Sequence, residues 1–136
     1  MFIDDEELRR LIECITVAID GKKGEKTLFT DFGGMTGIAC RYFVICEGHS
    51  SPQVEAIVQE VGERTREQLG IKPFGVVGLE HCTWVVLDYG DVMVHVFQPK
   101  ARQFYDLEHL WAASIYQLTV GEDLKVKGEL VGGAIE

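Results

Sequence analysis

Two aspartates near the middle of the chain have the types and spacing that metal chemistry could use. Asp88 and Asp91 lie on either side of Tyr89-Gly90, between two apolar segments. Carboxylates at this spacing can share a divalent cation through their oxygen atoms. Aspartates at hairpin ends commonly bond to turn amides instead, and no third acidic ligand lies nearby in the sequence. We therefore expect a turn rather than a metal site.

Histidines are the next candidates, and the chain has four of them: His49, His81, His95 and His109. Only the neighbours His81 and Cys82 are close in sequence, and adjacent strand residues point to opposite faces, which suits one metal ion poorly. His95 differs because it shares a strand face with Met93 and Phe97. It is either a histidine at the core edge bonded to a backbone carbonyl or a polar anchor within an apolar contact surface.

The turn Gly48-His49-Ser50-Ser51 could hold an anion. It places backbone N–H groups at a helix start after a strand, a geometry that can bind phosphate. It lacks a Gly-x-Gly-x-x-Gly or Walker pattern, however, and a helix N-cap requires no more than a serine. A nucleotide- or phosphate-binding enzyme is therefore the alternative to a binding protein.

Nucleophilic catalysis has no support in the sequence. There is no Gly-x-Ser-x-Gly motif, and no cysteine has the local signature of a thiol enzyme. Most of the cysteines lie in apolar patterns, where free Cys behaves as a small buried hydrophobe. The four cysteines of the chain are Cys14, Cys40, Cys46 and Cys82, and three of them lie in such patterns. We expect no catalytic residue, no metal and no cofactor, and a reducing, cytoplasmic location.

The length and composition of the chain limit the kind of domain that can position these residues. The 136 residues, 46% hydrophobic and 26% charged, suit one folded domain. No apolar run approaches the roughly 20 residues that cross a bilayer, and the acidic stretch 4–7 is unlike a basic targeting signal. The net charge of −9 disfavours direct DNA or RNA binding and suits a basic protein partner, although solubility alone also explains it.

Periodicity and turn residues predict two long helices and five strands. Apolar residues recur at helical spacing from Leu8 to Ile19 and from Val54 to Leu69, the second helix starting near Pro52 and closing at Gly70. The predicted strands lie at about 26–32, 42–46 and 73–77, with a hairpin over 84–97 that is apolar on both faces. We expect an α/β fold, a single domain with a mixed five-stranded sheet flanked by helices. The domain would span residues 1–111, and residues 112–136 would form a loosely packed extension.

Two longer motifs follow one another in this region. The first runs from Trp84 to Phe97 around the Asp-Tyr-Gly-Asp turn, and the second runs from Arg102 to Trp111 as Arg-Gln-Phe-Tyr-Asp-Leu-Glu-His-Leu-Trp. With the segments 42–45 and 48–51 upstream, they resemble the ribosomal silencing factor family, also called Iojap-like proteins. The resemblance covers about residues 5–111.

The resemblance implies a fold related to the nucleotidyltransferases without their activity. A working transferase would need a glycine turn followed about ten residues later by a pair of acids. Residues 38–47, which follow Gly33-Gly34, contain no such pair, and no glycine turn precedes Asp106-x-Glu108 at a suitable distance. The sequence therefore agrees that catalytic acids are missing.

The resemblance also implies a function and partners. Family members bind the large ribosomal subunit through its ribosomal protein number fourteen and obstruct joining of the small subunit, which represses translation chiefly when nutrients are short. They form homodimers, so a self-associating scaffold is a further alternative. No membrane is implied.

A set of partner-binding residues is expected on the hairpin and the segment after it. Trp84 would be an aromatic anchor, since such residues dominate interface energetics. The acids of the set would meet basic side chains of the partner, and Tyr89, His95 and Tyr105 would add polar and aromatic contacts. The competing expectation is that Trp84 and Tyr105 are buried in the core. The predicted set is Trp84, Asp88, Tyr89, Asp91, His95, Tyr105 and Glu108.

Two positions depart from the family pattern. Arg41 stands where the family usually carries Asp, and Val77 stands where Glu is usual. If either position contacts the partner, we expect binding to be weakened or altered. If they make internal salt links, only packing changes.

Overall fold

The computed structural model describes residues 5–33, 40–107 and 114–132. The elements in chain order are α1 (Glu6–Gly21), β1 (Glu25–Asp31), β2 (Tyr42–Glu47), α2 (Ser51–Leu69), β3 (Gly75–Val77), β4 (Trp84–Asp88), β5 (Val92–Phe97), α3 (Pro99–Tyr105), β6 (Ser114–Val120) and β7 (Val126–Gly132).

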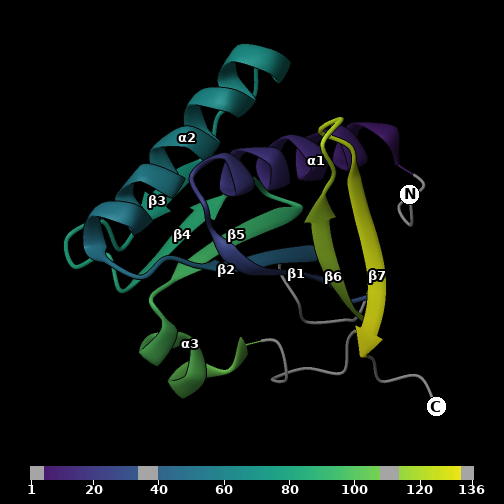
Figure 1. The fold of residues 1–136 in the computed structure, drawn as a ribbon. Helices are drawn as coiled ribbons and strands as arrows, with labels where there is room; N and C mark the ends of the chain where they lie inside the picture. The colour runs from purple at the N-terminus through teal and green to yellow at the C-terminus, as the bar shows by residue number, and fades with distance from the viewer. Residues whose placement is uncertain (1–4, 34–39, 108–113, 133–136) are drawn as a thin grey trace.

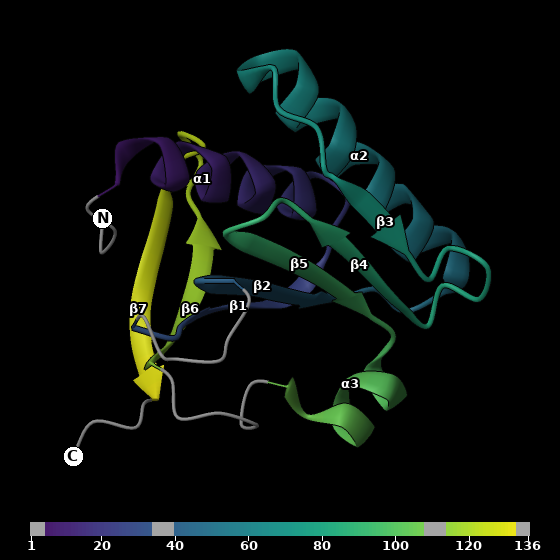
Figure 2. The ribbon, with the colours of Figure 1, turned by 180° about the vertical axis from the view of Figure 1, so that it is seen from behind.

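The strands form one mixed sheet in the order β3-β4-β5-β2-β1-β6-β7. Strands β2 and β5 are parallel, and every other neighbouring pair is antiparallel. Helices α1 and α2 lie across one face of the sheet, and the short α3 lies on the other (Figures 1 and 2). The predicted mixed sheet flanked by helices is confirmed.

Both long helices form where the sequence predicts them. The Asp5 carboxylate caps α1 by accepting hydrogen bonds from the amides of Glu7 and Leu8 at 3.0 and 3.2 Å. Ser50 caps α2 in the same way, and α2 ends at Gly70, whose φ of 68° is the left-handed conformation that glycine adopts readily. The residue types at the helix ends therefore fix both boundaries.

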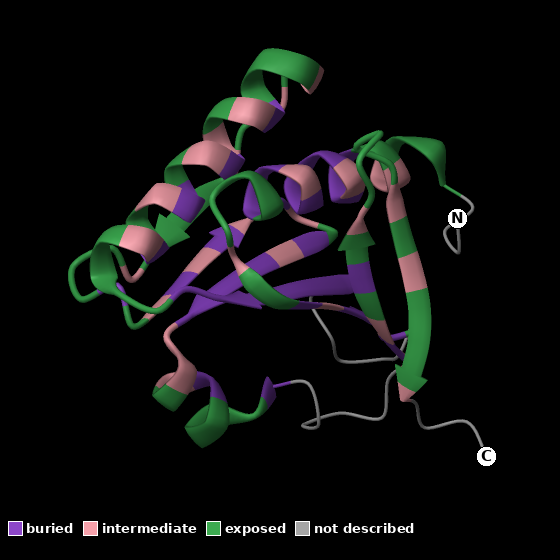
Figure 3. Cartoon of the chain, viewed as in Figure 1, coloured by how far each residue is buried: buried purple, intermediate pink, exposed green. Residues whose placement is uncertain are grey.

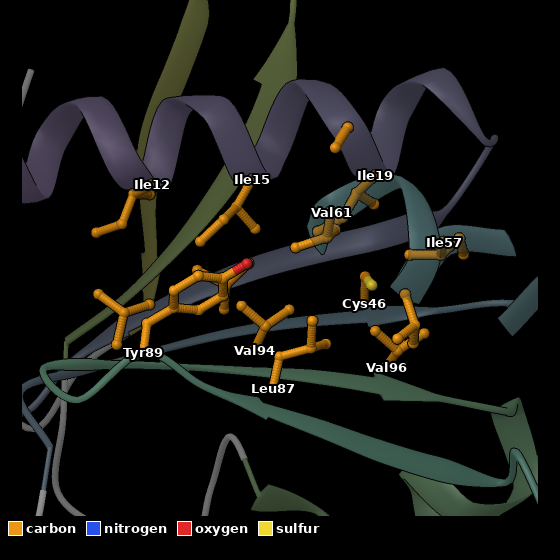
Figure 4. Packing of buried hydrophobic residues seen from close by; sticks show 14 of the residues in the cluster. Ile12, Ile15, Ile19, Cys46, Ile57, Val61, Leu87, Tyr89, Val94 and Val96 are labelled. Carbon is orange, nitrogen blue, oxygen red and sulfur yellow. The ribbon is translucent and has the colours of Figure 1, made fainter. Parts of the chain in front are cut away.

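The main core lies between these helices and the sheet (Figure 4). Ile12, Ile15 and Ile19 of α1 point onto the sheet, and the side chains of Leu87 and Val94 rise from β4 and β5 to meet them. The three isoleucines are completely buried, because they repeat along one stripe of the helix. This packing fixes which face of each strand the helices cover.

The expected count of five strands is wrong, because β6 and β7 add two more. Residues 112–136 were expected to form a loosely packed extension, yet β6 pairs with β1, and β7 pairs with β6. Ile115 and Leu118 are buried in the sheet, whereas most of β7 is exposed (Figure 3). A strand at an edge with little apolar burial carries no strong alternation, so the sequence pattern does not reveal it.

Within the described residues, no helix is both long and apolar enough to cross a membrane.

Candidate docking surface

The face of the sheet opposite α1 and α2 carries a second, smaller core. Its buried members are Phe32, Cys40, Phe43, Ile45, Phe97 and Leu107, with Trp84, Met93 and Ala101 packed against them. Strand alternation explains the division, since Val85 and Leu87 face the helices while Trp84, Val86 and Asp88 face away. Only the short α3 covers this face among the described helices (Figure 2).

Helix α3 is held to this face by a buried ion pair. Arg102 donates from Nη1 to the Lys26 carbonyl oxygen at 2.7 Å and lies 3.5 Å from a Glu47 carboxylate oxygen. Both charged side chains are 6% exposed. Removing one partner of such a pair leaves an uncompensated buried charge, so the pair fixes where α3 sits.

Trp84, His95 and Tyr105 come together beside α3. The Trp84 indole donates from Nε1 to His95 Nδ1 at 3.1 Å, and its ring centroid lies 4.6 Å from that of Tyr105. Trp84 is half-buried and Tyr105 is 47% exposed, so both reach the surface while packing on each other. The two competing expectations for these residues, burial and exposure, are therefore both partly met.

His95 is a core residue of this face. It is 4% exposed, and burial lowers the pKa of its imidazole to about 4. Because Nδ1 accepts the bond from Trp84, the neutral ring carries its proton on Nε2, which has no hydrogen-bond partner among the described residues. In this structure His95 thus holds the Trp84 indole through a hydrogen bond. Its expected role as a direct partner contact stays a prediction.

Tyr89 lies on the opposite face of the sheet from Trp84. Its ring is buried beneath α1 and α2, and its hydroxyl forms a 2.8 Å hydrogen bond with the Thr65 hydroxyl (Figure 4). Burial raises the pKa of this phenol. Tyr89 is therefore not at the surface in this structure, because odd-numbered positions of β4 and the turn residue after it point into the main core. Its expected contact with a partner stays a prediction.

The aspartates of the hairpin behave as turn residues. One Asp88 carboxylate oxygen accepts from the Gly90 amide at 2.8 Å, as expected of an acid at a hairpin end. The Asp91 carbonyl accepts from the amides of Arg41 and Tyr42 at 2.8 and 3.0 Å, while its side chain is exposed. No group of three metal-ligating side chains occurs in the part of the chain that the structure describes.

Two amides of the Gly48–Ser51 turn, and the Gln53 amide after it, donate hydrogen bonds within the protein. Gly48 donates to the Phe97 carbonyl at 2.8 Å, His49 donates to the Gln53 side chain at 2.7 Å, and the Gln53 amide donates to the Ser50 hydroxyl at 3.2 Å. A phosphate here would compete with bonds that the protein already makes. Ser50 therefore acts as a helix cap, which is the simpler of the two interpretations of this turn.

The cysteines are buried and free, as the apolar patterns predict. Burial raises the pKa of all four thiols, to about 11 for Cys40 and about 12 for Cys46, so they stay protonated and are poor nucleophiles.

We define the docking face as the residues that reach the surface on the sheet face away from α1 and α2: Trp84, Val86, Asp88, Asp91, Met93 and Tyr105. Val86 and Met93 were missed by the sequence analysis. The sequence pattern could have indicated them, since strand alternation places both on the same face as Trp84 and Asp88. Glu108 lies outside the described residues and stays a prediction.

The two positions that depart from the family pattern have different surroundings. Arg41 donates to the Tyr42 hydroxyl at 3.1 Å, and its guanidinium lies 5.1 Å from the centre of the Tyr42 ring. Val77 is 71% exposed at the edge of the sheet, opposite Val86. Arg41 therefore has an internal partner, whereas Val77 presents an apolar side chain to solvent.

The described residues thus form an α/β domain with a helix-backed sheet and a half-exposed aromatic face. Comparison with known proteins shows the family to which this domain belongs. A family model described as "Ribosomal silencing factor during starvation" matches residues 5–129. The chain belongs to the ribosomal silencing factor family.

Relatives and solved structures agree with this assignment. The ribosomal silencing factor RsfS of Halalkalibacterium halodurans is 40% identical over 103 residues, covering 76% of this chain and 86% of that protein. RsfS of Bacillus subtilis is 38% identical with the same coverage. A crystal structure of a protein from Chromobacterium violaceum matches with a TM-score of 0.71 and 31% identity, covering 76% of this chain and 84% of that one.

Proposed function

We propose that this chain silences ribosomes by binding the large ribosomal subunit through its ribosomal protein number fourteen, so that the small subunit cannot join. Translation would fall, chiefly under nutrient limitation. The mechanism is steric, because a body seated on one surface excludes another without any bond being made or broken. Family membership supports a ribosomal partner, and the net charge of −9 suits a basic one.

The docking face is the observation that carries this proposal. Trp84 and Tyr105 present a packed aromatic pair, and Val86 and Met93 extend the apolar surface beside it. Aromatic anchors surrounded by partly exposed apolar residues are typical of the centre of protein interfaces. Asp91, fully on the surface at the hairpin turn, supplies an acid at the rim.

Three further parts of the proposal follow from the family. The chain would act in the cytoplasm without a catalytic step, its fold would be related to that of nucleotidyltransferases that have lost their acids, and it would form homodimers in solution. The internal hydrogen bonds of the Gly48 and His49 amides support the absence of a nucleotide site at this turn. Calorimetry with nucleoside triphosphates and magnesium tests the enzymatic alternative, and light scattering tests the dimer.

Sedimentation with purified ribosomal subunits tests the function itself. The chain should co-migrate with large subunits and not with small ones, and adding it before mixing should reduce the fraction of joined ribosomes. Equal migration with both subunits, or joining that is unaffected at saturating protein, would refute the proposal.

The Asp91→Lys variant tests the docking face. Reversing a rim charge against a basic partner should weaken association with large subunits by about tenfold. Glu122→Lys is the matched control, because Glu122 is also an exposed acid and lies in the turn between β6 and β7, at the other side of the sheet. Equal weakening by both variants would mean that only net charge matters and that the docking face is assigned wrongly.

A further inference from the structure

Strand β3 leaves one side of the sheet open. It is the terminal strand and pairs only with β4 in the part of the chain that the structure describes. The large apolar side chains on and beside it are exposed: Phe74 by 83%, Val76 by 37%, Val77 by 71% and Leu79 by 46%. Unpaired backbone groups bordered by apolar side chains form a template for another strand.

The opposite edge of the sheet is built differently. Strand β7 also exposes apolar side chains, Leu130 and Val131, but it carries Lys127 and Glu129 within the strand. Charged residues along an edge strand discourage further pairing. The six residues from Phe74 to Leu79 contain no charge at all, so β3 is the less protected edge.

The β3 edge is continuous with the docking face. Val77 lies opposite Val86, which in turn lies opposite His95, so one row of side chains runs from the open edge to the covered centre of the sheet. The Phe74 amide donates to the Asp88 carbonyl at 2.7 Å, and a side chain added at Gly90 would lie 3.2 Å from the Phe74 ring. A partner seated on the docking face would therefore also reach β3.

Charge around this edge favours a basic occupant. Asp88 lies opposite Gly75 at the start of β3, and the exposed Asp91 follows in the same hairpin. The exposed Glu80 follows the other end of β3, and the exposed Lys72 precedes the strand. An extended segment that combines basic residues with apolar ones would meet both the acids and the apolar side chains of β3.

We propose that an extended, basic and apolar segment of the protein partner adds to the sheet as a further strand along β3. Main-chain hydrogen bonds would supply part of the affinity, and contacts to Val77 and the flanking acids would select the segment. The inference rests on the proposed function, because it describes how the large-subunit partner is held.

Two substitutions at Val77, which introduce long side chains of opposite charge, test the inference. Val77→Lys should weaken association with purified large subunits by about tenfold, because it sets a positive charge against a basic segment. Val77→Glu should bind within about threefold of the unchanged protein, since it adds a complementary charge. Leu130→Lys at β7, the same kind of change at the other edge, should have no effect.

A proline scan of Gly75, Val76 and Val77 tests the main-chain contribution. In an antiparallel strand, successive amides point alternately to the two sides. Proline should lower the melting temperature where the amide points to β4, but should weaken binding with little change in melting temperature where the amide points outward.

The outcomes separate the two hypotheses. If the unchanged chain does not sediment with large subunits, the proposed function and this inference both fail. If it does, but Val77→Lys binds normally and proline weakens binding only in proportion to lost stability, the strand addition alone is refuted. Equal loss with Val77→Lys and Val77→Glu would refute the basic character of the segment.

Discussion

The two faces of the sheet are made by the same central strands but are covered in different ways. On one face, α1 and α2 bury a continuous aliphatic layer that includes Ile15, Leu87 and Val94. On the other, α3 covers an aromatic group, and Trp84 and Tyr105 are left partly in contact with solvent. The first arrangement provides stability, whereas the second leaves ordered aromatic surface partly exposed, which is where we propose that a partner binds.

Truncation of the aliphatic layer should have the largest effect on stability. Ile15→Ala should lower the free energy of unfolding by about 3 kcal/mol, because Ile15 is completely buried and a cavity would remain. Chemical denaturation measures the loss. Below the unfolding transition, association with large subunits should be unchanged; a weakened affinity of the folded variant would contradict the division between the faces.

Acid should act on the aromatic face through His95. The pKa of this imidazole is lowered to about 4 in the folded chain, against 6.5 for an unshifted histidine. The unfolded chain therefore binds the proton first as pH falls, so the stabilisation is complete above pH 6.5 and is lost progressively between about 6.5 and 4. The full loss is roughly 3 kcal/mol.

Denaturation curves at a series of pH values measure this loss. His95→Gln should flatten the dependence of stability on pH in that window while keeping an acceptor for Trp84. A slope that is unchanged in the variant would place the titrating group elsewhere.

The smallest effect is expected at Tyr89, which belongs to the aliphatic face. Tyr89→Phe removes the 2.8 Å hydrogen bond to Thr65 and should lower the free energy of unfolding by about 1 kcal/mol. Binding to large subunits should not change, because the ring is buried beneath the helices. A selective loss of binding with normal stability would restore Tyr89 to the contact surface.

Much of the fold could be predicted from local patterns. The stripe from Leu8 to Ile19, the cap at Ser50 and the glycine at position 70 specify α1 and α2 directly. Strand β7 could not be predicted, because it lies at an edge and its side chains are mostly exposed, which removes the alternation that reveals a strand. Strand β6 was missed because its buried residues, Ile115 and Leu118, are three positions apart and do not follow strand alternation.

The residues of the docking face were only partly predictable, for a related reason. Strands β4 and β5 are apolar on both faces, so composition cannot tell which face two long helices cover. Alternation alone separates Trp84 from Tyr89, but it takes the packing of α1 to show that the Tyr89 side is the buried one. Asp88 was assigned correctly as a turn residue because its bond to the Gly90 amide is local.

The pairing of β1 with β6 bears on when the chain finishes folding. Leu28 lies opposite Gln117, so this side of the sheet cannot close until the segment around residue 117 has been synthesised. Contacts so distant in sequence also form slowly, because the intervening chain loses entropy before they are made. The pairing of β1 with β6 should therefore be among the later contacts to form when the chain folds.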